Sequence, residues 1–416
     1  MSVTYPLGFK AAATTAGLKP SGKPDLFLLV RDPSAASSFA AVFTTNQIVG
    51  APVAIGRDQR FRHLRGQLRT PRAVLVNAGN SNAATGEKGI ADAKACMAAV
   101  ATQLKCQPDE VVMSSTGVIG RPLPVDKIVA QVAGLAAAVS RSDDADAAAA
   151  AAIMTTDLVP KTALREITIG GTPVRIGAIA KGSGMIAPRL DSPAHAPTPS
   201  ATMLAFITTD VSIASRDLQM LLEDACGGSF NRISVDNHPS CSDTVICLAG
   251  GKSGVRLDRG TKDFTAFAEA FTDLCRELSE KVVTDGEGAT RIFKIAVKGA
   301  ASAADAEKMA REVVNSPLVK CAIHGRDPNW GRIVTAAGNA GVRFDPLRSG
   351  LTIGPVEVYR AGVPVIEALS DPRLKEAMTA KRVECVLTVG SGPGESWMLG
   401  CDLTKDYVTI NAEYTT

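Results

Sequence analysis

The chain has 416 residues, of which 45% are hydrophobic and 21% are charged, and its formal net charge is +3. This composition is that of an ordinary soluble globular protein, and the length allows about two or three domains, or one large core with a lobe. Because the net charge is small and the lysines and arginines are scattered, the sequence argues against nucleic-acid binding. No apolar run reaches the roughly 18 residues that cross a membrane. The N-terminus resembles neither a signal nor a transit peptide, so we expect a cytoplasmic protein.

The cysteines and histidines show no pattern that is typical of a metal site. None of the nine cysteines forms a C-x-x-C pair, and the four histidines lack metal-ligand spacing. An odd number of scattered cysteines favours reduced, mostly buried thiols over disulfides or zinc. Only Cys241 lies in a polar, loop-like context.

Strand and helix patterns alternate in the first half of the chain. Short apolar runs bounded by turn residues predict strands, and apolar residues at helical spacing predict helices. The expected strands cover residues 26–30, 73–77 and 111–113, the last followed by a small-residue turn at 114–120. The expected helices cover residues 86–106, 124–139 and 143–154. A hairpin at 166–177 then leads to a glycine-rich turn at Lys181.

The second half has the same alternation. Strands are expected over 244–248 and 292–297, and helices over 215–226, 261–283 and, capped by Ser302, to about residue 314. A loop at 325–332 follows, and the last third is expected to be rich in strands up to the closing segment 407–416. Because there is no clean βαβ repeat, this order favours mixed α/β layers over a Rossmann sheet.

One threonine stands out for its chemistry. After a proline-rich tract, Ala201 and Thr202 open an apolar run from Met203 to Ile207. If the peptide bond before a threonine is broken, the new α-amine can act as the general base for the hydroxyl of the same residue. Thr202 is therefore a candidate nucleophile. The alternative is that it is only a β-branched residue at the start of a strand.

Several motifs follow one another along nearly the whole chain. They are Val76-Asn77-Ala78-Gly79-Asn80-Ser81-Asn82, Ser115-Thr116-Gly117-Val118-Ile119-Gly120, Met154-Thr155-Thr156-Asp157, Lys181-Gly182-Ser183-Gly184-Met185-Ile186, Ala201-Thr202-Met203-Leu204, Asp285-Gly286-Glu287-Gly288-Ala289, and the ending from Gly400-Cys401-Asp402-Leu403-Thr404 through Asn411 to Thr416. In this order they resemble the glutamate N-acetyltransferase, or ornithine acetyltransferase, family of arginine biosynthesis.

The resemblance implies self-cleavage between Ala201 and Thr202. This would give an N-terminal chain of residues 1–201 and a C-terminal chain of residues 202–416, associated as a heterotetramer. The implied fold is a mixed-sheet αββα sandwich similar to N-terminal-nucleophile hydrolases, with a smaller α/β lobe. The implied enzyme is an N-acetyltransferase whose Thr202 takes acetyl from N-acetylornithine and passes it to glutamate. No cofactor is implied, and the use of acetyl-CoA as a second donor stays open.

The resemblance also assigns roles to residues. Thr116 and Gly117 match the family's oxyanion donors, and a Thr-Gly turn can supply a hydroxyl and a backbone N–H for this purpose. The matching substrate-binding residues are Thr155, Lys181, Thr202, Glu287, Asn411 and Thr416. A lysine suits a carboxylate and a glutamate suits an ammonium. The alternatives are a strand-exit turn, solvated charges and helix caps, and we interpret His238 and Trp330 as structural.

The sequence departs from the family pattern in two places. Arg189 to Ser200 lengthen the loop before Thr202, and we expect this segment to be an exposed insertion in which His195 has no catalytic role. The stretch from Val235 to Thr244 also differs, which leaves the substrate preference open. A self-processing amidase or aminopeptidase, a transferase for other amino acids and an uncleaved, non-catalytic homologue remain alternatives.

Overall fold

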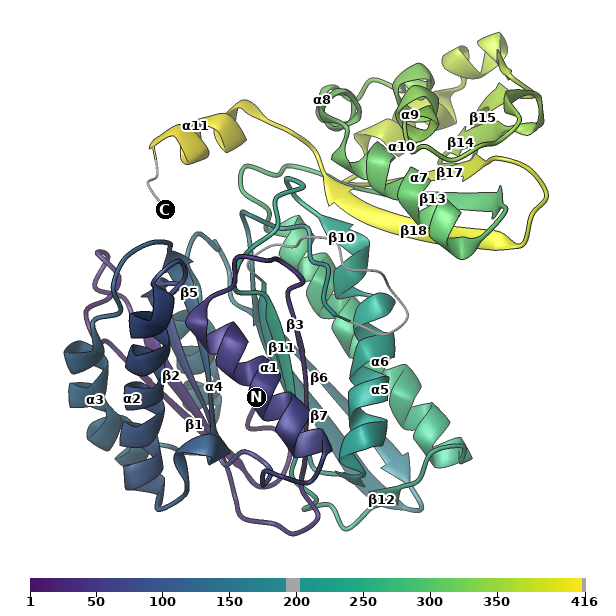
Figure 1. Cartoon of the computed structure of the whole chain (residues 1–416). Helices are drawn as coiled ribbons and strands as arrows, with labels where there is room; N and C mark the ends of the chain where they lie inside the picture. The colour runs from purple at the N-terminus through teal and green to yellow at the C-terminus, as the bar shows by residue number, and fades with distance from the viewer. Residues whose placement is uncertain (192–202, 414–416) are drawn as a thin grey trace. The chain divides into compact units, whose positions relative to one another are not determined.

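The computed structural model describes residues 1–191 and 203–413, which divide into two compact units (Figure 1). Unit 1 contains Met1–Asn231 and His238–Val282. Unit 2 contains Arg232–Asn237 and Val283–Thr415. The unit boundary therefore differs from the predicted cleavage site, because the segment after residue 202 contributes to both units.

Unit 1 is built on two mixed sheets. The first has the order β1 (Phe9–Thr14), β2 (Leu26–Arg31), β4 (Ala73–Asn80) and β5 (Val111–Val118). The second has the order β3 (Ser38–Phe43), β11 (Thr244–Ala249), β8 (Leu204–Thr209), β7 (Thr172–Lys181) and β6 (Lys161–Ile169). The parallel pairs are β4–β5 and β11–β8, and the remaining pairs in both sheets are antiparallel.

The two sheets share one hydrophobic core. Phe27 of the first sheet and Phe206 of the second meet edge to face, with 5.9 Å between ring centroids. The other face of the first sheet packs against α2 (Gly86–Leu104) and α3 (Val125–Ala137). On the second sheet, α5 (Ser215–Gly227) packs on β3, and α6 (Lys262–Thr284) bonds to β6 through Lys281 Nζ and the Thr162 carbonyl at 2.6 Å. Figure 1 shows these layers, and they confirm the predicted αββα sandwich.

Two further helices and a pair of short strands also belong to unit 1. Helix α1 (Ala51–Leu64) contacts β3 and β5, and α4 (Asp143–Ala152) packs on β1. The short strands β9 (Ser212–Ile213) and β12 (Arg256–Leu257) pair in parallel. Ser142 caps α4 by accepting a hydrogen bond from the Ala145 amide, which fixes the start of the alanine-rich helix that the sequence predicts.

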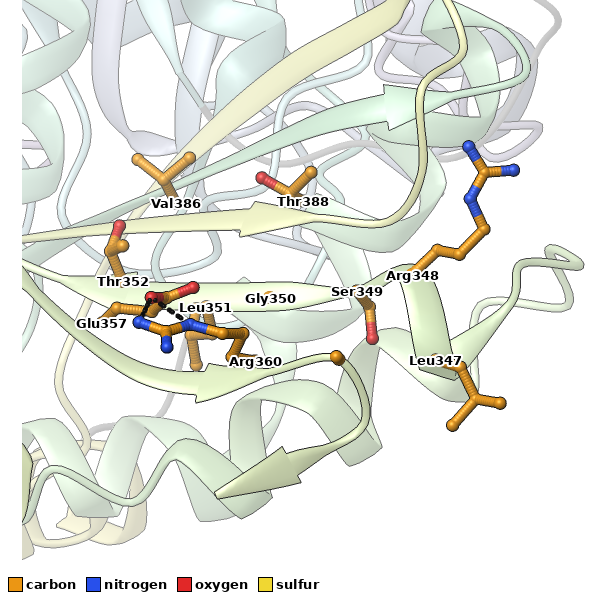
Figure 2. A pocket seen from close by; sticks show the side chains of 11 residues that line it. Leu347, Arg348, Ser349, Gly350, Leu351, Thr352, Glu357, Arg360, Val386 and Thr388 are labelled. Carbon is orange, nitrogen blue, oxygen red and sulfur yellow. Dashed lines mark hydrogen bonds and ion pairs between the residues drawn. The ribbon is translucent and has the colours of Figure 1, made fainter. Parts of the chain in front are cut away.

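Unit 2 is the smaller α/β lobe that the sequence predicts. Its sheet has the order β10 (Ile233–Ser234), β18 (Gly394–Cys401), β13 (Ile292–Ala300), β17 (Arg382–Thr388), β14 (Gly350–Ile353), β15 (Val356–Arg360) and β16 (Val363–Pro364). Its helices are α7 (Ala303–Asn315), α8 (Pro317–Gly325), α9 (Trp330–Gly338), α10 (Pro372–Thr379) and α11 (Lys405–Glu413). One sheet face and α7 bury Phe293, Ile295 and Met309 together. Figure 2 shows a shallow pocket on β14, β15 and β17, where Arg360 and Glu357 form an ion pair.

Two predicted loops are shorter than expected. Residues 114–118 continue β5 instead of forming a turn, because their backbone remains paired with β4, from Ser114 opposite Val76 to Gly117 opposite Gly79. Residues 330–332 open α9 instead of ending a loop. Here the Asn329 side chain caps the helix by accepting from the Arg332 amide at 3.2 Å.

The prediction of a strand near the C-terminus is wrong. Residues 405–413 form α11, although Val408, Thr409 and Ile410 are β-branched residues that favour strands. The Thr404 hydroxyl accepts a hydrogen bond from the Tyr407 amide at 3.3 Å, which satisfies a free N–H of the first helical turn. A capping contact therefore decides the conformation of this segment against its intrinsic preference.

All nine cysteines are free thiols, and all except Cys106 and Cys321 are buried, which confirms the expected burial. The polar context of Cys241 does not expose it, since this residue is buried as well. The described residues contain no group of side chains that could hold a metal ion. Among the described helices, none is long and apolar enough to cross a membrane.

The burial of the thiols predicts their order of reaction. Burial raises the pKa of Cys226 and Cys275, so these thiols are rarely the reactive thiolate. In the native protein we expect an alkylating reagent to modify Cys321 first and Cys106 slowly, and to reach all nine cysteines only after denaturation. Peptide mass spectrometry after timed labelling measures this. Rapid native labelling of Cys226 would contradict the packing.

Candidate active site

Three of the predicted site residues meet in unit 1. Lys181 is the last residue of β7, and its Nζ donates to Thr155 Oγ1 at 2.8 Å and to Thr116 Oγ1 at 3.3 Å. Thr116 lies in β5, and Thr155 lies in the segment that follows α4. Thr116 and Lys181 are almost fully buried, with 1% and 2% of their surface exposed. The fold therefore joins side chains from both sheets around a single ammonium group.

Gly117 sits beside Thr116 at a point that only glycine can occupy. Its φ is +128°, and a Cβ there would lie 2.4 Å from the Gly79 carbonyl carbon. The ladder between β4 and β5 is irregular at this point, with Asn80 opposite both Thr116 and Val118. The Asn77 side chain holds the bend by donating to the Asn80 carbonyl at 2.8 Å. The strand is therefore irregular at Thr116 and Gly117, the two residues that the family resemblance assigns as oxyanion donors.

A buried carboxylate holds this cluster together. Asp157 Oδ1 accepts from Lys161 Nζ at 2.6 Å and from the Gly182 amide at 2.7 Å. Its Oδ2 accepts from the Thr155 amide at 3.1 Å and lies 4.0 Å from Lys181 Nζ. Burial alone would raise the pKa of Asp157, but Lys181, Lys161 and the amide donors outweigh it and hold this pKa below its ordinary value. Asp157 is therefore an anion that positions Thr155 and Lys181 together.

The start of β8 lies beside Lys181. Met203 is buried, its amide donates to Asp243 Oδ1, and its carbonyl accepts from the Thr244 amide at 3.0 Å. The next residue, Leu204, is the β-sheet partner of both Lys181 and Thr244. Ala201 and Thr202, the predicted cleavage site and nucleophile, lie outside the described residues.

The beginning of the predicted insertion is anchored to the core. Leu190 is buried, and its amide donates to Asn231 Oδ1 at 2.8 Å. Asp191 accepts two hydrogen bonds from the Arg60 guanidinium, at 2.7 and 2.9 Å. The expectation of a wholly exposed insertion is therefore wrong for these residues, because α1 supplies a matching cation. Residues 192–200, including His195, lie outside the described part of the chain.

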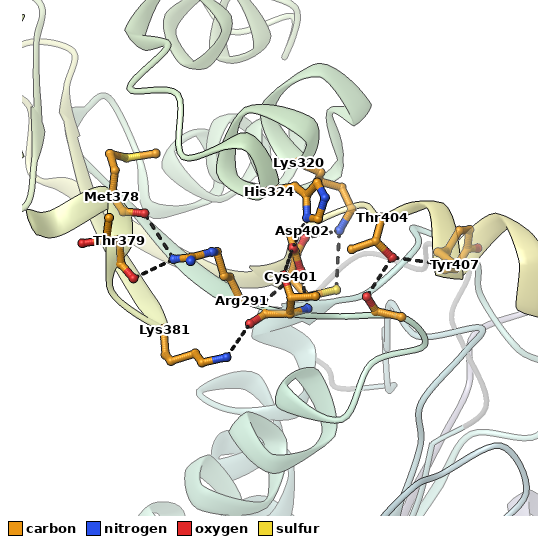
Figure 3. Close-up of polar contacts among 12 residues, drawn as sticks. Arg291, Lys320, His324, Met378, Thr379, Lys381, Cys401, Asp402, Thr404 and Tyr407 are labelled. Atoms are coloured by element: carbon orange, nitrogen blue, oxygen red, sulfur yellow. Dashed lines mark hydrogen bonds and ion pairs between the residues drawn. The ribbon is translucent and has the colours of Figure 1, made fainter. Parts of the chain in front are cut away.

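A second set of predicted residues meets in unit 2. Asn411 Nδ2 of α11 donates to Glu287 Oε2 at 2.8 Å, and Glu287 is only 8% exposed. Figure 3 shows contacts beside it, where Thr404 Oγ1 donates to the Gly288 carbonyl at 2.8 Å and His324 contacts Asp402. The Thr404–Gly288 bond connects the residue before α11 to the segment that carries Glu287. Thr416, the remaining predicted substrate-binding residue, lies outside the described residues.

The sequence did not identify Asp157 and Lys161 as site residues. Asp157 closes the Met-Thr-Thr-Asp motif, and Lys161 comes four residues later at the first position of β6. A lysine at the start of a strand looks like a solvated charge, and only the structure shows that it is 1% exposed. Trp330 stacks on Tyr359 with 5.4 Å between ring centroids, which supports its interpretation as structural.

The buried ion pair predicts a large effect of Asp157→Asn. The substitution removes the carboxylate from the buried Asp157–Lys161 pair, and breaking a buried pair costs about 3–5 kcal/mol. We expect denaturant unfolding of Asp157→Asn to show a free energy of unfolding that is lower by this amount. Lys161→Met combined with Asp157→Asn should recover part of the loss, because the uncompensated charge is removed. If Asp157→Asn alone were as stable as the parent protein, this would refute the role of Asp157.

Comparisons with known proteins identify the family of the chain. The model of the ArgJ family matches residues 10–416. A relative from Symbiobacterium thermophilum named arginine biosynthesis bifunctional protein ArgJ is 43% identical, with 100% of this chain and 98% of the relative covered. A second relative of the same name, from Rhodopirellula baltica, is 42% identical, with 100% of this chain and 97% of the relative covered.

Among solved structures, the bifunctional ArgJ protein from Bacillus halodurans is 36% identical with a TM-score of 0.49, over 51% of this chain and 100% of that chain. The family model and the two relatives span essentially the whole chain, including the positions of both residue clusters. The chain therefore belongs to the ArgJ family.

Proposed function

We propose that the protein transfers an acetyl group from N-acetylornithine to glutamate in arginine biosynthesis, with Thr202 as the nucleophile. The observation that carries the proposal is the cluster of Lys181, Thr116 and Thr155 beside the strand that Met203 opens. The curated relatives are named as arginine biosynthesis proteins, which agrees with this assignment.

The proposed reaction has two steps. Thr202 Oγ attacks the acetyl carbonyl of N-acetylornithine while the α-amine of Thr202 takes the hydroxyl proton and passes it to the leaving amine. The C–N bond breaks, ornithine leaves, and the acetyl group stays as an ester on Thr202. The amine of glutamate then attacks this ester, which releases N-acetylglutamate and returns the proton to the threonine oxygen. No cofactor is needed, and acetyl-CoA is a further candidate donor for the first step.

Thr116 and Gly117 are proposed to stabilise the oxyanion of both steps. Lys181 Nζ donates to Thr116 Oγ1, so the oxygen accepts from the lysine and the hydroxyl proton can point elsewhere. A hydroxyl donor polarised by an ammonium is suited to a developing negative charge. The positive φ of Gly117 turns the backbone at the adjacent residue, where its amide would be the second donor.

The remaining predicted residues are proposed to bind the substrates. Lys181 and Thr155 suit a carboxylate, and Glu287 with Asn411 suits the side-chain ammonium of ornithine. Thr416 is proposed as a further contact. We also propose a cytoplasmic location, as expected for an enzyme of amino-acid biosynthesis.

The sheet order supports a stable association of the two chains after cleavage. Strand β3 and the β6–β7 hairpin precede residue 201, whereas β8 and β11 follow it. The chains would therefore remain joined by the β3–β11 and β7–β8 ladders and by the shared core. We propose that two such pairs form a heterotetramer.

Self-cleavage is the first test. The 43.2 kDa chain should run on a denaturing gel as two fragments of similar size, and N-terminal sequencing of one fragment should read Thr-Met-Leu-Ala. Thr202→Ala should stay intact because the hydroxyl is lost, whereas Thr202→Ser keeps a hydroxyl and serves as the matched control. A wild-type chain that remains whole would contradict the proposal and favour a non-catalytic homologue.

The acetyl-enzyme is the second test. Protein mixed with N-acetylornithine alone should gain one acetyl group on the C-terminal fragment, detected by mass spectrometry, and steady-state kinetics should be ping-pong. Thr116→Ala should lower kcat by about 10²–10³, and Thr116→Ser should retain most of it because the hydroxyl remains. Hydrolysis without transfer to glutamate would instead indicate an amidase.

A further inference from the structure

Lys19 belongs to a loop that lies against the predicted oxyanion donors. The Leu18 carbonyl oxygen is only 2.8 Å, and the Lys19 nitrogen 3.2 Å, from the position of a Cβ added at Gly79. Gly79 is itself the β-sheet partner of Gly117. The loop therefore contacts β4 at the point where β4 supports Gly117.

A carboxylate inside the loop fixes its backbone. Asp25 accepts from the amides of Ala16 and Leu18 at 2.6 Å each and from the Lys19 amide at 3.1 Å. Asp25 is fully buried. Its oxygens are thus occupied by backbone donors, and the position of Lys19 follows from this rigid turn.

The Lys19 side chain reaches the other side of the site. Its Nζ donates to the Pro24 carbonyl at 2.6 Å and to the Ala152 carbonyl at 2.9 Å. Ala152 is the last residue of α4, three positions before Thr155, whose hydroxyl bonds to Lys181. Lys19 therefore links the β4 side of the cluster to the Thr155 segment.

The Lys19 ammonium has one donor more than the carbonyl acceptors that the described residues give it. Both of its acceptors are neutral carbonyls, an ammonium has three donors, and no ion pair of Lys19 occurs among residues 1–191 and 203–413. Burial lowers the pKa of Lys19 to about 8; the positive charges of Lys181 and Lys23 add to this, and Asp25 and Asp157 oppose it.

We propose that Lys19 binds a carboxylate group of the amino-acid substrate, next to Lys181, and is a further substrate-binding residue of this site. The inference rests on the proposed function, because it assigns the substrate's anionic group to this cluster. A bound carboxylate would occupy the third donor of the ammonium and supply the opposite charge that its two carbonyl acceptors lack. It would also explain why a partly buried lysine is held by carbonyls alone.

The test compares Lys19→Met with Lys23→Met in the full chain. Lys23 is an exposed lysine of the same loop, so its substitution removes an equal charge outside the cluster. For Lys19→Met we expect KM for N-acetylornithine and for glutamate to rise about 10- to 100-fold, with a small change in kcat, because one charged hydrogen bond to bound substrate is lost. Lys23→Met should keep the parental KM.

A purely structural role would give a different result. If Lys19 only caps α4, Lys19→Met should lower the melting temperature without changing KM, and this outcome would overturn the proposal. Calorimetric titration with glutamate separates the inference from the proposed function, since binding does not require transfer. Glutamate binding that depends on Lys19 in a protein without transferase activity would refute only the proposed function. Equal affinity of Lys19→Met and Lys23→Met for glutamate would refute the inference.

Lys19→Arg tests the charge of residue 19 through the pH dependence of KM, which a purely structural role would not change. The ammonium of Lys19 loses its charge as the pH rises through its pKa of about 8, so KM of the parent protein should increase above this pH. An arginine remains charged over the whole range. We expect Lys19→Arg to abolish this increase, and an unchanged pH profile of KM would contradict the assignment.

Discussion

The ion pair between Asp157 and Lys161 is the contact on which the site in unit 1 depends. Burying two charges is costly, and the cost is offset only where further hydrogen bonds complete the pair. Here the amides of Gly182 and Thr155 provide them. The same carboxylate faces Lys181 at 4.0 Å, so the strand end and the preceding segment are fixed by one anion. A structural interaction thereby sets the geometry of residues that are proposed to bind substrate.

Backbone shape supplies the second constraint. Gly117 lets β5 approach the backbone of Gly79 and Asn80 in β4 more closely than any side chain would allow, and Gly79 leaves room for the backbone of Leu18 and Lys19. Thr116 consequently lies within reach of Lys181 on the opposite sheet. The sandwich is therefore also the means by which Thr116, the proposed oxyanion donor, is brought together with Lys181 and the start of β8.

Much of the fold could be predicted from sequence patterns. The runs that became β2, β4 and β11 and the periodic segments that became α2, α5 and α6 have local signals strong enough to survive tertiary packing. The errors lie where a single long-range or capping contact decides. Residues 114–118 remain a strand because β4 pairs with them, and residues 405–413 form a helix that Thr404 caps. Asp191 is held by Arg60, far away in the sequence, so the first residues of the insertion are anchored where the sequence suggested an exposed loop.

The sequence by itself determined the family, the candidate nucleophile Thr202 and the types of residue around it, because ordered motifs identify chemistry without coordinates. It could not determine which motif residues touch. The tertiary structure brought Thr116, Thr155 and Lys181 together in one unit and Glu287 with Asn411 in the other. It also turned Asp157, Lys161 and Lys19 from ordinary charges into parts of one electrostatic cluster. Burial and the position of opposite charges come only from packing, and these two quantities decide what a charged side chain does.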